Sequence, residues 1–195
     1  MTEEQRYRFI RFLILNRHAS PVEHVAFTFF ISAPIFVFRE FMRHRIASYN
    51  EESGRYKTMS PVFYVPNAER KLQQVGKVGE YKFVEGTPEQ HELVQAEMRA
   101  QSISAYESYQ RLLDANVARE VSRMALPLNL YSSMYVTMNI RSILNFLSLR
   151  SSAEGYFTSF PQREIEMVAE QMEAIIAEET PLVYRAFLEG KRVAV

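Results

Sequence analysis

The chain has 195 residues and contains no cysteine. This absence excludes disulfide bonds, thiolate metal ligands and a cysteine nucleophile. A cytoplasmic location is the default expectation for such a chain.

The chain also lacks net charge, because 23 basic residues balance 23 acidic ones. General attraction to nucleic acid or to an anionic membrane is therefore not expected, and any anion site must be a local cluster. The longest apolar run, residues 25–38, is interrupted by Thr28, Ser32 and Pro34 and is too short for a bilayer span. The polar start at residues 1–6 does not resemble a signal peptide. We expect no membrane association.

Several common functional motifs are missing. There is no glycine-rich phosphate loop, no dinucleotide fingerprint and no Gly-x-Ser-x-Gly elbow. The four histidines do not have the spacing of metal ligands on a helix, so we expect no metal site.

Apolar residues make up 47% of the chain, which is typical of a globular protein. The length favours one domain, residues 1–195. Capping boxes at Thr2 and Thr87 predict the starts of two helices. The expected helices are 3–16, Pro34 to about Arg45, 88–113, 118–125, 141–150, 162–178 and 181–189. The expected strands are 25–31 and 131–139, with short ones near 62–65 and 81–84. This pattern predicts an α+β fold with a small, mainly antiparallel sheet.

The stretch from Arg43 to Tyr56 concentrates cationic side chains directly after an apolar run. Within it, Ser53-Gly54-Arg55 has the parts of a phosphate clamp: a hydroxyl, a backbone that allows close approach, and a guanidinium fork. The alternative is a solvated loop whose arginines pair with Glu51 and Glu52. The pattern alone does not choose between them.

A second cluster lies between Asn139 and Arg150. Arg141 and Asn145 are one helical turn apart and share a face. Arg150 lies on or beside the apolar stripe, so its guanidinium needs an acceptor, either a ligand carbonyl or a protein carboxylate. From the residues alone, a structural salt bridge is the commoner answer.

A third cluster surrounds Glu120, with Arg119 and Arg123 on one helix face before the segment 126–129. The residues by themselves favour an ordinary surface helix with a Glu120–Arg123 pair.

One segment of the chain resembles a known family. Arg43-His44-Arg45, followed by seven residues and Ser53, matches the signature of the flavin-dependent thymidylate synthases. The likeness extends over most of the chain, through residues 18–24, Arg123 with 126–129, and 139–150.

This resemblance implies roles residue by residue. The residues implied to contact FAD are Ser20, Arg43, His44, Arg45, Glu51, Asn139, Arg141 and Asn145. The residues implied to hold deoxyuridine monophosphate (dUMP) are Glu40, Phe41, Met42, Arg43, Glu51, Glu52, Ser53, Gly54, Arg55, Arg123 and Arg150. Arg150 would also act as the catalytic residue, by contacting the pyrimidine carbonyl region and favouring the polarised form of the ring.

The resemblance further implies a homotetramer whose sites are shared between subunits. The implied reaction converts dUMP to thymidine monophosphate (dTMP), with carbon from methylenetetrahydrofolate and hydride from NADPH through FAD. The absence of cysteine agrees with this route, because the other thymidylate synthase chemistry needs a thiolate on the pyrimidine ring.

Two departures from the family pattern are visible. The chain begins without the strand and turn that usually precede the helix at Glu3, and residues 154–160 diverge where a histidine is usual near Glu154. Two alternatives stay open: a paralogue that modifies the nucleotide differently, for example by hydroxymethylation, and a non-catalytic nucleotide- or RNA-binding module.

Overall fold

The computed structural model describes all residues from Met1 to Val195. The chain divides into two compact units. The first contains residues 1–31, 37–51 and 133–195, and the second contains residues 32–36 and 52–132. No helix is long and apolar enough to cross a membrane.

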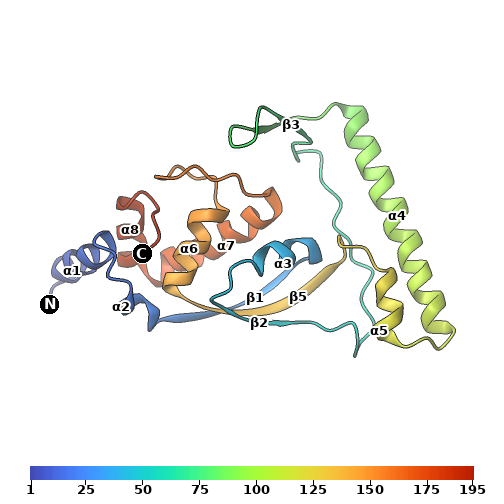
Figure 1. The fold of residues 1–195 in the computed structure, drawn as a ribbon, viewed down its shortest axis with the longest axis horizontal. Helices are drawn as coiled ribbons and strands as arrows, with labels where there is room; N and C mark the ends of the chain where they lie inside the picture. The colour runs from blue at the N-terminus through green and yellow to red at the C-terminus, as the bar shows by residue number, and fades with distance from the viewer. The chain divides into compact units, whose positions relative to one another are not determined.

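A three-stranded sheet organises the first unit, with the strand order β1-β5-β2 (Figure 1). The strands are β1 (Ala26–Pro34), β2 (Ser48–Glu51) and β5 (Tyr131–Asn139). Strand β2 is antiparallel to β5, with Ser48 opposite Thr137. Strand β1 also runs antiparallel to β5, because the Ile140 amide donates to the Val25 carbonyl at 2.9 Å and the hydroxyls of Thr28 and Thr137 lie 2.9 Å apart.

Burial alternates along β5, as expected for a strand with one covered face. Met134, Val136 and Met138 are almost fully buried, whereas Tyr135 between them is 53% exposed. Helices α6 and α7 lie over one face of the sheet in Figure 1. The helices of this unit are α1 (Glu3–Leu15), α2 (Ser20–Glu23), α3 (Ile35–Phe41, which begins in the second unit), α6 (Ile140–Arg150), α7 (Arg163–Glu179) and α8 (Pro181–Glu189).

Helix α6 is the element that carries most of the second arginine cluster. Asn139 caps its N-terminus, with the side-chain oxygen accepting from the Ser142 amide at 2.9 Å. Its buried apolar residues occupy one broad stripe. This burial fixes the rotation of the helix, so Arg141 and Asn145 must face outward.

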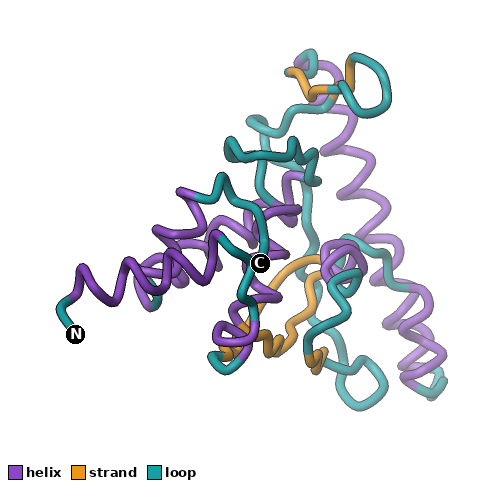
Figure 2. Tube along the Cα trace, turned by 60° about the vertical axis from the view of Figure 1, so that its left-hand side comes forward, coloured by secondary structure: helices purple, strands orange, loops and turns teal.

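The second unit is built around α4 (Pro88–Asp114), which is the long helix in the tube view of Figure 2. Its other elements are β3 (Gln73–Val75), β4 (Lys82–Val84), α5 (Arg119–Ser122) and the 3₁₀ turn η1 (Arg123–Ala125). Its core contains Met59, Tyr109 and Leu130. The Tyr109 hydroxyl accepts from the Met59 amide at 3.1 Å, which fixes the loop before α4 to the helix.

The sequence-based fold class is confirmed, as are both capping boxes and the strand at 131–139. Several details were wrong. Strand β2 was not expected, α3 ends at Phe41 instead of continuing to Arg45, and the expected strand at 62–65 is reduced to a single bridge between Phe63 and Leu130. In addition, Pro34 ends β1 rather than opening α3.

Candidate functional site

A cavity of about 710 Å³ opens in the first unit beside α6. Four separate stretches contribute to it: the end of α2, the turn after α3, the end of β5 with α6, and the C-terminal residue Val195. Seven predicted site residues line it together: Arg43, His44, Arg45, Asn139, Arg141, Asn145 and Arg150. The fold therefore brings together two sequence clusters that lie almost a hundred residues apart.

The turn after α3 buries one side chain of the Arg43-His44-Arg45 triplet and exposes the other two. The Arg43 amide donates to the Glu40 carbonyl at 3.2 Å and the His44 amide to the Phe41 carbonyl at 3.0 Å, so the chain stays coiled for one more turn. His44 is buried against Phe146, with ring centroids 4.8 Å apart. Arg43 and Arg45 are exposed, and neither forms an ion pair with a carboxylate. Two guanidiniums at the cavity are therefore available to an anion.

His44 is a neutral hydrogen-bond acceptor. Burial of the imidazole, and secondarily the charge of Arg150, lowers the pKa of His44 from 6.5 to about 4. The Arg150 Nε donates to His44 Nε2 at 3.0 Å. Because Nε2 accepts, the proton of the neutral ring must lie on Nδ1.

Arg150 is the last residue of α6, and its guanidinium returns to the turn after α3. Besides His44, it contacts the carboxylate of Glu40 in an ion pair. The side chains of Arg150 and Glu40 are only 20% and 24% exposed. The acceptor that the sequence required is thus a protein carboxylate together with an imidazole, while Arg150 still lines the cavity.

Arg141 stands in the first turn of the same helix. Its Nη1 pairs with Glu23 of α2, and its Nε donates to the Val195 carbonyl at 3.1 Å. Glu23 was missed by the sequence analysis, because no local pattern connects two residues 118 positions apart. Asn145, one turn beyond Arg141, is exposed at the cavity as its spacing predicted.

Some predicted residues lie away from the cavity lining. Ser20 is exposed at the start of α2, and Glu51 ends β2. Phe41 is fully buried and stacks on Phe146, with the ring centroids 4.4 Å apart, so its side chain belongs to the core. Met42 is 37% exposed.

The second unit contains the remaining predicted residues, grouped around a turn at Glu52–Arg55. A Cβ added to Gly54 would lie 3.3 Å from the Met59 side chain and 3.4 Å from Arg123 Cδ, so Gly54 allows Met59 to pack closely against the turn, with Arg123 beside it. The Arg55 amide donates to the Ser53 hydroxyl at 3.3 Å.

The ion pairs of this turn differ from both expected patterns. Arg55 pairs with Glu120 at 3.1 Å. From the sequence, Arg55 was expected to pair with Glu51 or Glu52, and Glu120 was expected to pair with Arg123. Lys57 pairs with Glu52. The Arg55 and Glu120 side chains are 51% and 56% exposed, so Arg55 can exchange Glu120 for another partner at little cost.

With the site described, the comparisons with known proteins become informative. The family model described as "Thymidylate synthase complementing protein" matches residues 1–182. The chain belongs to the flavin-dependent thymidylate synthase family. The resemblance seen in the sequence is therefore confirmed.

Individual members of this family are similar over most of their length. A flavin-dependent thymidylate synthase of Tropheryma whipplei strain TW08/27 is 60% identical over 186 residues, which cover 95% of this chain and 78% of the relative. One from Streptomyces coelicolor is 59% identical over 187 residues, covering 95% and 76%.

A solved structure shares the fold. It is a UMP/dUMP methylase, PolB from Streptomyces cacaoi, bound with 5-Br UMP. It superposes with a TM-score of 0.94 at 46% identity and covers 97% of this chain and 84% of that one. Together with the family membership, this similarity shows that the chain is an enzyme of the methyltransferase class and that the family's activity is flavin-dependent.

Proposed function

We propose that this chain methylates dUMP to dTMP, with carbon from methylenetetrahydrofolate and reducing equivalents from NADPH through FAD. The observation that carries the proposal is the cavity in which the 43–45 triplet meets Arg141, Asn145 and Arg150. The relatives named as flavin-dependent thymidylate synthases support it, as does the PolB structure bound with 5-Br dUMP.

The donor groups at the cavity fit a cofactor with a pyrophosphate. Arg43 and Arg45 have no carboxylate partner, and Arg141 stands at the N-terminal end of α6, where the helix dipole also favours an anion. We assign FAD to Arg43, His44, Arg45, Asn139, Arg141 and Asn145, with Ser20 and Glu51 contributing from outside the cavity lining. When bound, FAD supplies the reducing equivalents that no side chain of a cysteine-free chain can supply.

Ser53, Gly54, Arg55 and Arg123 have the hydroxyl, open backbone and guanidiniums that a phosphate needs. Arg55 can exchange Glu120 for a phosphate at little cost, because an exposed ion pair contributes no more than about 1 kcal/mol. The other residues assigned to dUMP are Glu40, Phe41 (through its main chain), Met42, Arg43, Glu51, Glu52 and Arg150.

Arg150 is assigned the catalytic role. Its guanidinium is already held between Glu40 and His44, and it lines the cavity. A fixed positive charge beside a pyrimidine carbonyl stabilises the negative charge that develops there when the ring is polarised. Because the His44 imidazole is neutral, it adds no second positive charge beside the pyrimidine.

We further propose that the chain works in the cytoplasm as a homotetramer with shared sites, without nucleic-acid or membrane partners. The exposed face of the sheet supports an interface. The ring centroids of Phe30 (β1) and Tyr135 (β5) lie 5.1 Å apart on this face, although the two side chains are 62% and 53% exposed.

The test is a reconstitution. Purified protein is loaded with FAD, its absorption spectrum and native mass are recorded, and it is then supplied with dUMP, methylenetetrahydrofolate and NADPH. We expect a flavin spectrum, a tetramer, and a product heavier than dUMP by one methylene group. UMP is assayed in parallel, because PolB is a methylase of both UMP and dUMP.

The same assay separates the alternatives. A product that carries an added hydroxymethyl group would indicate the paralogue with different chemistry. Binding of RNA that weakens steeply with salt, with no flavin spectrum, would indicate a binding module. No turnover with saturating FAD would contradict the proposal.

A further inference from the structure

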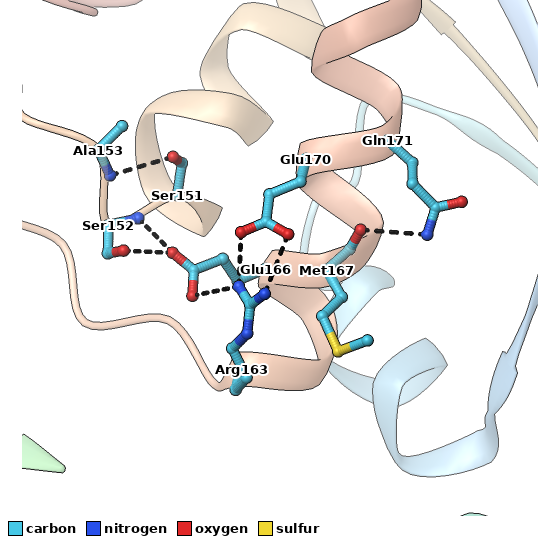
Figure 3. A network of polar contacts seen from close by, with 8 residues as sticks. All are labelled: Ser151, Ser152, Ala153, Arg163, Glu166, Met167, Glu170 and Gln171. Atoms are coloured by element: carbon cyan, nitrogen blue, oxygen red, sulfur yellow. Dashed lines mark hydrogen bonds and ion pairs between the residues drawn. The ribbon is translucent and has the colours of Figure 1, made fainter. Parts of the chain in front are cut away.

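Two residues after Arg150, a buried carboxylate holds the main chain (Figure 3). The Ser152 amide donates to Glu166 Oε1 at 2.8 Å, and the Ser152 hydroxyl donates to the same oxygen. The other oxygen, Oε2, accepts from Arg163 Nη1 at 3.0 Å. Glu166 is 8% exposed and does not line the cavity, so it has no direct access to a ligand there.

This carboxylate is kept charged by its partners. Burial raises the pKa of Glu166, but the hydrogen bonds from Ser152 and Arg163 outweigh it, and the net pKa is lowered. Arg163 also forms a forked contact with Glu170, at 2.5 and 3.1 Å, on the side away from Ser152. Figure 3 shows Glu166 between Ser152 and Arg163, with Glu170 touching only the arginine.

The main chain at Arg150 needs such support. The last carbonyls of a helix have no donor within the helix, so its final turn frays easily. Ser151 is already extended, with φ −125° and ψ 140°, so the helix gives no support beyond Arg150. Side chains supply the missing bonds instead: the Ser159 hydroxyl donates to the Leu149 carbonyl at 2.5 Å, and Glu166 holds Ser152.

We propose that Glu166 is a positioning residue for Arg150: by holding Ser152, it fixes the end of α6 so that the Arg150 guanidinium stays at the cavity. This inference rests on the proposed function, in which Arg150 contacts the pyrimidine. A misplacement of about 1 Å can cost on the order of a hundredfold in rate, so a contact outside the cavity can control catalysis.

The test compares three variants of the FAD-loaded enzyme. Glu166→Ala removes both bonds to Ser152, whereas Glu166→Gln keeps an acceptor oxygen for them. Glu170→Ala is the matched control, since it removes the outer partner of Arg163 and leaves Ser152 untouched. Equilibrium dUMP affinity, FAD affinity, kcat and the melting temperature are measured for each.

We expect Glu166→Ala to weaken dUMP binding and to lower kcat by about tenfold each, while FAD affinity stays within about twofold. Glu166→Gln should lose less than about threefold, and Glu170→Ala should match the wild type. If Glu166→Ala does not fold, Ser152→Ala removes the hydroxyl bond alone and should lose about threefold. Equal losses in the Glu166→Ala and Glu170→Ala variants would overturn the proposal, because they would indicate general destabilisation.

A double-mutant cycle with Arg150→Ala decides whether Glu166 acts through Arg150. With Arg150 removed, the further change Glu166→Ala should leave dUMP affinity unaltered. A second tenfold loss would show that Glu166 acts elsewhere and would overturn the inference. If Arg150→Ala itself changed neither dUMP binding nor turnover, the assigned role of Arg150 would fail instead.

Discussion

Helix α6 carries an arginine at each end, Arg141 in its first turn and Arg150 at its last residue, and both line the same cavity. Each pairs with one carboxylate, but the surroundings differ. The side chains of Arg141 and Glu23 are 50% and 39% exposed, whereas those of Arg150 and Glu40 are 20% and 24% exposed.

The helix dipole sharpens this difference. A cation is unfavourable at a helix N-terminus and favourable at a C-terminus. Arg141 therefore adds to a positive end that an anion can neutralise, and its exposed pair with Glu23 contributes no more than about 1 kcal/mol. Arg150 is stable where it stands. This difference agrees with the proposed roles, FAD binding for Arg141 and catalysis for Arg150.

The largest expected effect is at the Arg150 end. Replacing Arg150 by alanine removes the only assigned group that stabilises charge on the pyrimidine, so turnover should fall by about 100- to 1,000-fold. FAD affinity should stay within about twofold. Steady-state rates and a flavin titration measure both, and a variant as fast as the wild type would contradict the assignment.

The next effect concerns the burial of His44. Because its folded pKa is about 4, below the ordinary 6.5, the unfolded chain binds more protons in that range, and folding stability falls as pH falls from 6.5 to 4. The contribution of His44 should be about 2 kcal/mol smaller at pH 5 than at pH 8. Denaturant unfolding at both pH values measures it. His44→Gln should flatten this dependence.

The smallest expected effect is at the Arg141 end. Arg141→Ala should weaken FAD binding by about tenfold, or about 1.4 kcal/mol, and reduce its dependence on salt. Glu23→Gln frees Arg141 and should tighten FAD binding by about two- to fivefold. If Arg141→Ala instead slowed turnover a hundredfold at saturating FAD, the two ends of α6 would not differ as we describe.

Helix α6 could be predicted from the sequence because its signals are local. The periodic apolar residues fix its rotation, so the predicted shared face of Arg141 and Asn145 was correct. The position of Arg150 at the edge of the apolar stripe also showed that its guanidinium needs an acceptor.

The partners of these residues could not be predicted in the same way. Glu23 reaches Arg141, and Glu40 reaches Arg150, across more than a hundred positions. Such pairs depend on the packing of whole elements, which leaves no periodic signal. Strand β2 was missed for a related reason: its four residues form a strand because β5 provides the hydrogen-bonding edge.

The strand order β1-β5-β2 has a consequence for how the enzyme is made. The two outer strands are both synthesised before residue 52, but the strand that must lie between them follows only at residue 131. Closing so long a loop carries an entropic cost before any contact stabilises the sheet, which slows folding. During synthesis on the ribosome, the edges of β1 and β2 therefore stay unpaired until β5 has been made. The cavity can form only after α6 has emerged. We expect a nascent chain stalled before residue 131 to be protease-sensitive throughout its first fifty residues.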